Sequence, residues 1–446
     1  MDDLRPLRLP QGRLEERFEE KKPAYSPAEA MAEANRCLYC ADAPCIKACP
    51  TAIDIPTFIH KISTGNVKGA ARTILTQNLL GESCGQVCPV EVLCAGACVY
   101  NGWGRDPIKI GRLQRYAVEE TLAKDPALFK KKPSTGKKVA LIGSGPASIA
   151  AAGWLALEGH KAVIFERKKT PGGLNTLGIA PYKMKGGEAL DEIAWVLGLG
   201  DIELRLGVEV VSGEAGPGQV SAKALLADYD AVFLGLGLGA DSALGVPGED
   251  GEGVVGATAL IERIKADPSL TLDGVKKAIV VGGGNTAIDV VHELALLGVE
   301  AVMVYRRSEA EMSGYEHEMA AARLDGARLV ENRAPIAVVR DGGRVKALRV
   351  APAKGGKPAA GEPEEDIPAD LIVVAIGQNR ATQVALAFPG VELDGKGRVV
   401  VDKATGRTGN PKVYSGGDCV NGGKEVVNAV AEARVAVQAM HVTFQG

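Results

Sequence analysis

Hydrophobic and polar positions follow two different patterns along this chain. From about residue 10 to 125, apolar residues recur at helical intervals, as in SPAEAMAEANRCLYC (26–40), where a Ser–Glu pair also marks a helix start. Beyond the charged, proline-containing stretch KDPALFKKKPSTGKK (124–138), short apolar runs alternate with helical segments. The sequence therefore predicts an α/β protein with an all-α N-terminal domain.

One plan occurs twice in the α/β part. KKVALIGSGPASIAAAGWLALEGHKAVIFER (137–167) and KKAIVVGGGNTAIDVVHELALLGVEAVMVYRR (276–307) each predict a strand, a glycine-rich turn, a helix and a strand, which together make a Rossmann unit. Two such units in one chain predict two different dinucleotides. The predicted boundaries are a helical domain at 1–125, a linker at 126–135, one dinucleotide domain at 136–254 completed by 379–446, and another at 255–378.

Composition narrows the class of protein. The 446 residues are 46% hydrophobic and 24% charged, with a net charge of −3, so there is no electrostatic case for nucleic acid or an anionic membrane as a partner. The first 22 residues hold no apolar segment, and the longest apolar runs fall far short of the roughly 20 residues that span a bilayer. We therefore expect a cytoplasmic protein.

Eight of the nine cysteines lie between Cys37 and Cys98. They form the runs CLYCADAPCIKACP (37–50) and CGQVCPVEVLCAGAC (84–98). Clustered thiols in a reducing compartment indicate metal, and three close cysteines with a fourth before proline are typical of bacterial [4Fe–4S] ligands. Zinc or inert buried cysteines are the alternative, but zinc sites usually use paired C-x2-C knuckles and only one is present.

We expect these cysteines to bind two separate clusters. In two-cluster proteins of this kind, the last cysteine of a run ligates the other cluster. The first cluster is then expected at Cys37, Cys40, Cys45 and Cys98. The second takes Cys49, Cys88 and Cys94, and spacing alone makes Cys84 its fourth ligand.

The first glycine-rich turn, GSGPAS, has the features of a dinucleotide site. Its glycines allow a tight turn and a close approach of pyrophosphate to a helix N-terminus, and a carboxylate about 20 residues later suits an adenosine ribose. The next motif, PGGLN, is expected to bring backbone against a flavin. The candidate residues are Gly143, Gly145, Pro146, Ala147, Ser148, Glu166, Gly172, Gly173 and Leu174.

The second turn, GGGNTA, belongs to a unit whose second strand ends differently. The candidate residues of the turn are Gly282, Gly284, Asn285, Thr286 and Ala287. The strand ends in Arg306 and Arg307 instead of an acid, and arginine holds a 2′-phosphate well. NADPH is therefore favoured over NADH, with surface arginines that bind nothing as the alternative.

Residues 12–120 resemble the N-terminal iron–sulfur domain of dihydropyrimidine dehydrogenase, through GRLEERF, RCLYCADAPCIKACP and PIKIGRLQRYA; the glutamate synthase small-subunit family is similar but less close. The resemblance implies that Gln114, rather than Cys84, completes the second cluster. VYSGGDCVNGGKEVVNAVAEA (413–433) resembles a flavin signature of the disulfide-reductase-like superfamily, which implies FAD contacts by Gly417, Asp418 and the helix near Asn428. GIAPYKMKGG (178–187) departs from the GIPxFRLP of these relatives.

The expected function is electron input to a larger complex. FAD accepts electron pairs from NADPH or NADH, and a [4Fe–4S] cluster passes on one electron at a time. Only Cys419 lies near the flavin segments, so thiol–disulfide chemistry is excluded. The expected partner is an FMN-dependent dihydropyrimidine dehydrogenase subunit in a hetero-oligomer; a glutamate synthase or another oxidoreductase subunit, a free-standing NADPH:ferredoxin-type reductase and a non-enzymatic scaffold are the alternatives.

Overall fold

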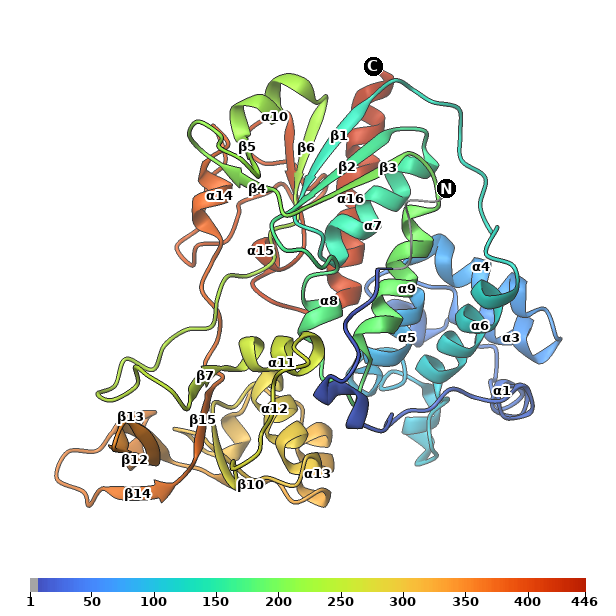
Figure 1. Ribbon diagram of the computed structural model, residues 1–446. Helices are drawn as coiled ribbons and strands as arrows, with labels where there is room; N and C mark the ends of the chain where they lie inside the picture. The colour runs from blue at the N-terminus through green and yellow to red at the C-terminus, as the bar shows by residue number, and fades with distance from the viewer. Residues whose placement is uncertain (1–6) are drawn as a thin grey trace.

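The computed structural model describes residues 7–446 and has three parts (Figure 1). A helical N-terminal domain is followed by two parallel five-stranded sheets, each with helices packed on it. The predicted α/β plan with an all-α N-terminal domain is confirmed. Within residues 7–446, no helix is long and apolar enough to cross a membrane.

The helical domain forms where capping and apolar periodicity agree. Ser26 and Glu29 make the expected reciprocal cap, and Pro27 follows at the first helical position. Phe58, from the middle of this domain, is fully buried in its core. The elements are η1 Leu14–Arg17, α1 Pro27–Ala34, α2 Pro44–Ala48, α3 Ile55–Ser63, α4 Val67–Gln77, α5 Gly81–Val87, η2 Val90–Val92, η3 Val99–Trp103 and α6 Ile110–Lys124.

The first sheet domain has the strand order β16-β6-β1-β2-β3, and all its strands are parallel. Its strands are β1 Lys138–Ile142, β2 Lys161–Glu166, β3 Ile202–Leu206, β6 Ala231–Leu234 and β16 Val413–Ser415, and β4 Glu209–Val211 pairs separately with β5 Gln219–Ser221. Its helices are α7 Pro146–Leu157, α8 Leu174–Leu177, α9 Gly186–Leu197, α10 Ala222–Asp228, α14 Thr382–Leu386, α15 Asp418–Asn421 and α16 Val426–Gln445.

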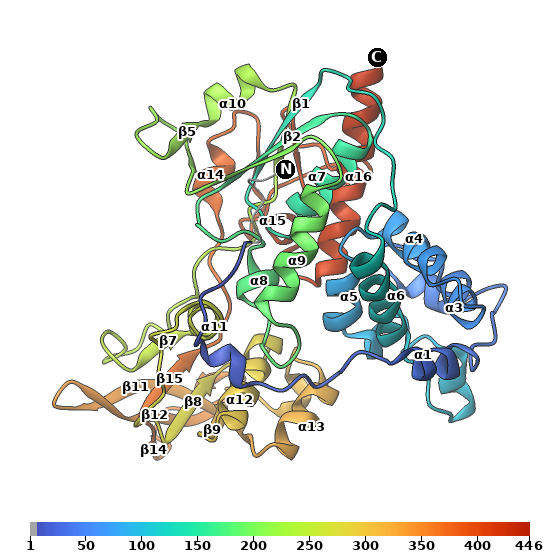
Figure 2. The same ribbon diagram turned by 45° about the vertical axis from the view of Figure 1, so that its right-hand side comes forward.

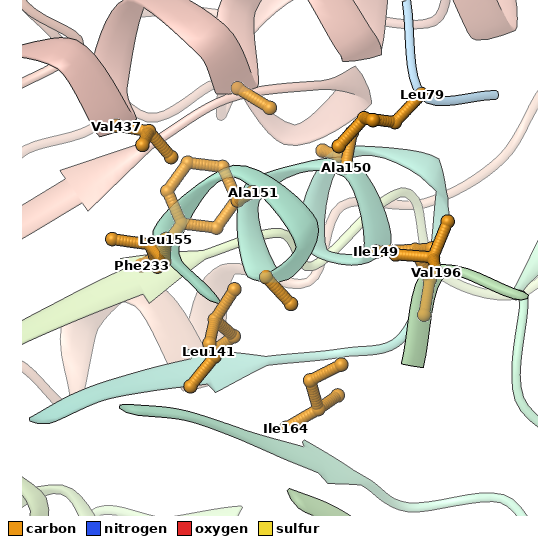
Figure 3. Packing of buried hydrophobic residues seen from close by; sticks show 14 of the residues in the cluster. Leu79, Leu141, Ile149, Ala150, Ala151, Leu155, Ile164, Val196, Phe233 and Val437 are labelled. Carbon is orange, nitrogen blue, oxygen red and sulfur yellow. The ribbon is translucent and has the colours of Figure 1, made fainter. Parts of the chain in front are cut away.

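Helix α7 lies at the centre of this domain's core (Figure 3). Leu141 of β1 and Val437 of α16 pack around it, because the small residues of α7 let neighbouring elements approach closely. Leu79, which precedes α5, is also fully buried in this core. The helical domain is therefore joined to the first sheet domain by shared apolar packing.

The second sheet domain has the strand order β10-β9-β8-β15-β7 and carries an antiparallel hairpin arm. Its sheet strands are β7 Val254–Gly256, β8 Lys277–Val281, β9 Glu300–Val304, β10 Arg328–Val330 and β15 Leu371–Val374. Its helices are α11 Ala257–Ala266, α12 Asn285–Leu296, η4 Glu309–Glu311 and α13 Glu316–Leu324. The arm consists of β11 Arg333–Asp341, β12 Arg344–Lys354, β13 Lys357–Pro358 and β14 Glu365–Pro368.

The N-terminal segment links the parts. In Figure 2 it runs past α11 and α12 of the second sheet domain before it reaches α1. Leu14 and Phe18 are buried in the core of the second sheet domain, although the rest of the helical domain follows them directly in sequence.

Candidate functional site

Two cavities begin at the two glycine-rich turns. The α7 cavity, of about 200 Å³, is lined by Gly145, Pro146 and Ala147 at the start of α7. The α12 cavity, of about 500 Å³, is lined by Gly282, Gly284 and Thr286 at the start of α12. Both helix N-termini thus present backbone N–H groups to open space, which suits a phosphate.

The α7 cavity collects residues from both predicted flavin signatures. Leu174 follows the PGG turn, and Gly417 and Asp418 begin α15. Gly145 has open space where a Cβ would lie, so a ligand can approach its backbone. Glu432 accepts a hydrogen bond from the Gly417 N–H at 2.7 Å and so orients this turn. The donor set and the open backbone fit an extended phosphate-bearing cofactor such as FAD.

Glu166 ends β2 as predicted and is buried beside the first turn. Its carboxylate accepts from the N–H and Oγ of Ser144 at 2.9 and 2.7 Å and from the Lys168 N–H at 2.8 Å. Gly172 contacts the same serine, because its N–H donates to Ser144 Oγ at 3.1 Å. Glu166 therefore braces the first turn against the PGG segment, and its position does not line the α7 cavity.

The second sheet domain supplies a polar wall to the α7 cavity that the motifs do not indicate. The Lys183 ammonium forms ion pairs with Asp289 Oδ1 and Glu318 Oε1, both at 2.7 Å. All three residues line the α7 cavity. Burial opposes the charge on Lys183, but the two carboxylates outweigh it and raise the pKa of the lysine. The Tyr315 hydroxyl donates to Glu425 Oε1 at 2.8 Å, and burial together with this carboxylate raises the pKa of Tyr315 to about 12.

The α12 cavity contains the arginine pair. Arg306 and Arg307 follow β9 and line the cavity with Ser313 and Gly356. Among residues 7–446, no carboxylate forms an ion pair with either guanidinium, although Arg307 lies over the ring of Tyr305. Two guanidinium groups beside a helix N-terminus form a donor set for a phosphate monoester.

Four cysteines surround a third cavity, named the Cys40 cavity. Cys37, Cys40, Cys45 and Cys98 all line it, together with Leu38 and Tyr100, and the remaining lining is apolar. Leu38 is 47% exposed, so this cavity lies close to the surface of the protein. The predicted exchange of the last cysteine between the two runs brings these four residues together.

The Cys88 cavity is lined by five candidate ligands, Cys49, Cys84, Cys88, Cys94 and Gln114. The Gln114 amide N–H donates to the Gly81 carbonyl at 2.7 Å, which leaves its amide oxygen as the atom it can offer to a metal. The neighbouring Cys84 thiol and burial raise the pKa of Cys88. Both predicted alternatives for the fourth ligand therefore reach the same cavity.

The electrostatics of the cysteines fit a metal cluster. Burial and the neighbouring Cys37 raise the pKa of Cys45 to about 11, and burial and Cys49 raise that of Cys94 to about 12. These thiols would stay protonated without a positive partner, whereas bound iron holds them as thiolates. Within residues 7–446, no three His, Cys, Asp or Glu side chains converge as ligands of one ion. The cysteines surround cavities instead, as the separated iron atoms of a cluster require.

A thin wall separates the α7 cavity from the Cys88 cavity. Val87 and Pro89 line the α7 cavity, while Cys88 between them lines the other. At the start of α16, Val426 lines the α7 cavity and its neighbour Val427 lines the Cys88 cavity. Two stretches of adjacent residues thus line both cavities, and apart from the Cys88 thiol their side chains are apolar.

Helix α5, which carries Cys84 and ends before Cys88, is held by a buried carboxylate. Glu192 of α9 accepts from the N–H groups of Glu82 and Ser83, at 2.7 and 3.2 Å, and from the Ser83 hydroxyl. Asn175, which lines the α7 cavity, donates to the same hydroxyl at 2.9 Å. Burial raises the pKa of Glu192. This network connects the lining of the α7 cavity to the helix that carries Cys84 and leads to Cys88, both of which line the Cys88 cavity.

Several predicted residues do not line the cavities. Gly143, Ser148, Glu166, Gly172, Gly173 and Asn428 lie outside the lining of the α7 cavity, Asn285 lines the α7 cavity and not the α12 cavity, and Ala287 is buried beneath Gly282. Asp241 and Gln378, which the motifs do not indicate, line the α12 cavity. Asp241 accepts from the Thr258 and Ala259 N–H groups, so it caps α11. No local signal marks these residues, because they come from connecting segments.

Two family profiles match the chain. Residues 14–126 match dihydropyrimidine dehydrogenase domain II, 4Fe-4S cluster, and residues 137–433 match pyridine nucleotide-disulphide oxidoreductase. Together they cover the helical domain and both sheet domains, with the division between the two at the predicted linker.

Two relatives match this chain over nearly its whole length. The glutamate synthase [NADPH] small chain of Escherichia coli (strain K12) is 35% identical over 94% of this chain and 92% of its own. The NAD-dependent dihydropyrimidine dehydrogenase subunit PreT of Escherichia coli O157:H7 is 32% identical over 96% of this chain and 98% of its own. Both relatives are named as one subunit of a larger enzyme.

Solved structures support the fold of the sheet domains. Thioredoxin reductase of T. acidophilum covers 70% of this chain and all of its own, with a TM-score of 0.55 and 20% identity.

The two profiles and the whole-length relatives show the family. The chain is an FAD-containing pyridine nucleotide oxidoreductase with a 4Fe-4S domain, and it belongs to the family of the glutamate synthase small chain and the dihydropyrimidine dehydrogenase subunit PreT.

Proposed function

We propose that this chain is the electron-input subunit of a heteromeric oxidoreductase. It takes hydride from NAD(P)H, with NADPH favoured, and delivers electrons one at a time to a catalytic partner subunit. Bound FAD would accept the electron pair and release it singly to two [4Fe–4S] clusters. The names of the relatives support a partner, since each describes a chain or subunit of a larger enzyme.

The observation that carries the proposal is the thin wall between the α7 and Cys88 cavities. Val87, Cys88 and Pro89 are consecutive, yet they face a proposed flavin site and a proposed cluster site alternately. Electrons that arrive at the α7 cavity therefore have a short, apolar path to the Cys88 cavity. The Cys40 cavity, close to the surface at Leu38, is the proposed exit.

The chain's own residues hold and orient the groups. The proposed FAD set combines residues that line the α7 cavity, Gly145, Pro146, Ala147, Leu174, Gly417 and Asp418, with residues behind that lining that shape the turns, Gly143, Ser148, Glu166, Gly172, Gly173 and Asn428. The proposed NAD(P)H set is Gly282, Gly284, Asn285, Thr286, Ala287, Arg306 and Arg307. The proposed cluster ligands are Cys37, Cys40, Cys45 and Cys98 for one cluster, and Cys49, Cys88, Cys94 and Gln114 for the other.

For the partner, the leading proposal is an FMN-dependent dihydropyrimidine dehydrogenase subunit, because the iron–sulfur profile matches residues 14–126. A glutamate synthase large subunit is the second candidate. It is favoured by the unpaired arginines of the α12 cavity, since the glutamate synthase relative is NADPH-dependent by name and PreT is NAD-dependent.

Anaerobic purification and titration test the proposal. We expect about eight irons and one FAD per chain, and bleaching of the flavin by NADPH followed by reduction of the clusters. Zinc in place of iron, or a colourless protein, would contradict the proposal and favour the scaffold alternative. Co-purification identifies the partner, and a chain that stays alone while it reduces ferredoxin would indicate a free-standing reductase.

A further inference from the structure

The second sheet domain is tied to the first by a buried lysine. Lys265 lies on α11, and its side chain is 0% exposed. Its ammonium donates to the Ile179 and Met184 carbonyls, at 2.9 and 2.8 Å, in the GIAPYKMKGG segment of the first sheet domain. The third acceptor is Glu15 Oε1 at 3.4 Å. The three N–H groups of Lys265 thus have three acceptors, none of them on its own domain.

Glu15 completes this contact from a third direction. It belongs to the N-terminal segment, and its side chain is also 0% exposed. The same Oε1 accepts from the Gly186 N–H at 2.7 Å, where α9 begins, and Arg13 donates to Oε2 at 3.0 Å. A buried carboxylate with two cationic neighbours and a backbone donor is fully satisfied only while all these elements are in place.

Other residues of the N-terminal segment also form polar contacts with more than one domain. The Lys21 N–H donates to the Tyr182 carbonyl at 3.1 Å, and its side chain pairs with Asp325 of the second sheet domain. Glu20 pairs with Arg115 of α6 in the helical domain, and Arg115 also bonds Glu188 of α9. Residues 13–22, together with the buried Leu14 and Phe18, therefore form a strap across all three parts (Figure 2).

We infer that Lys265 and Glu15 are positioning residues for hydride transfer: they fix the α12 cavity against the α7 cavity, so that a nicotinamide bound to one domain meets the flavin bound to the other. This inference rests on the proposed function. The two cavities meet at the start of α12, where Gly284 and Thr286 line one and Asn285 lines the other. A small rotation of the second sheet domain would separate the reacting rings without removing any group that binds either cofactor.

Lys265→Met and Glu15→Gln in the full-length holoprotein test the inference, with Arg263→Met as the matched control. Arg263 lies on the same helix, but its side chain is 52% exposed. Its ion pair is local, with Asp267 four residues later, and does not join two domains. Three quantities are measured for each protein: deuterium exchange of residues 13–22 and 179–186, the Kd for NADP⁺, and the anaerobic rate of flavin bleaching at saturating NADPH. Dithionite bleaching reports the amount of intact flavin.

For Lys265→Met we expect faster exchange in both segments, a Kd within about two-fold of the wild type, and a rate of flavin bleaching about 10- to 100-fold lower, as displacement of reacting groups predicts. Glu15→Gln should change the exchange and the rate in the same direction and by less, and it decides the matter if Lys265→Met does not fold. Arg263→Met should match the wild type.

Unchanged exchange in both test variants, or a bleaching rate within about two-fold of the wild type in both, would overturn the inference. The exchange measurement needs no turnover. A wild-type flavin that neither NADPH nor NADH bleaches would instead contradict the proposed function, and exchange would still report on the strap.

Discussion

At the walls of the α7 cavity, the helical domain contributes apolar side chains and the second sheet domain contributes polar ones, and we call these the apolar side and the polar side. The apolar side is reinforced by the hydrogen bonds of Glu192 to α5. On the helical side, Leu79 is buried against α7, and Val427 packs against Cys88. On the other side, the partly buried Lys183 and Asp289 form an ion pair, and the fully buried Lys265 donates to the Met184 carbonyl. A path for electrons needs only a short, fixed separation, whereas a joint that admits a nicotinamide must also solvate and release a polar ligand.

The largest effect is expected from breaking the apolar side. Cys88→Ser removes a thiolate from the wall, and we expect iron to fall from about eight toward about four per chain. Reduction of the remaining cluster by NADPH should slow at least about 100-fold, since loss of a ligand exceeds the effect of outer-shell changes. Flavin bleaching by NADPH should stay within about two-fold, because the polar side is intact.

Stopped-flow absorbance and EPR measure these steps separately. Cys419→Ser is the control, since Cys419 is buried but lines neither cysteine cavity. Normal cluster reduction in Cys88→Ser would show that electrons do not cross this wall.

On the polar side, Arg306→Ala with Arg307→Ala should raise the KM for NADPH about 10- to 100-fold, which corresponds to the loss of one charge-assisted hydrogen bond of about 1.5–3 kcal/mol to the 2′-phosphate. The KM for NADH should stay within about two-fold. Steady-state kinetics with both nucleotides check this, with Arg349→Ala on the hairpin arm as the control. Equal effects on the KM for NADPH and for NADH would contradict the proposed contact between the arginines and the 2′-phosphate.

The fourth ligand of the Cys88 cavity is a finer test of the apolar side. Gln114→Cys should change the EPR signal of one cluster and lower its potential, because a thiolate donates more charge than an amide oxygen. Cys84→Ala should leave both signals as in the wild type. The reverse result would assign the ligand to Cys84.

The smallest effect concerns the stability of the joint to the helical domain. Burial raises the pKa of Glu192, so the folded protein keeps this proton to a higher pH than the unfolded chain. Burial raises this pKa from 4.5 to about 7, so stability should fall as pH rises between these two values, by about 1.4 kcal/mol per pH unit.

Glu192→Gln should flatten this slope, which thermal midpoints measured across the pH range would detect. Glu203→Gln is the control, because its hydrogen bond with Arg205 lowers the pKa of that carboxyl and its effect falls at lower pH. A wild-type slope in Glu192→Gln would mean that other groups set the pH dependence.

The sequence predicted the features that local spacing determines. The Ser26 cap and the two Rossmann units depend on residues that interact within one element or one motif, whereas the lining of the Cys40 cavity by Cys98 joins two runs of the sequence. Such spacing is fixed by helix and turn geometry, so it can be recognised without the fold.

The contacts between domains could not be predicted in this way. Asp289 and Tyr315 reach the α7 cavity from another domain, and Glu15 reaches Lys265 across about 250 residues. Nothing in the neighbouring sequence distinguishes these residues from ordinary surface charges. Their role comes from how the three parts pack, which is a property of the whole chain.

The alternation of Val87, Cys88 and Pro89 places a strict limit on chain length at the wall. One extra residue within this run would change which of its side chains lines each cavity and would displace the Cys88 sulfur from the Cys88 cavity. Loops usually tolerate insertions and deletions. At these three positions they should instead abolish electron transfer between the two cavities, even where the overall fold survives.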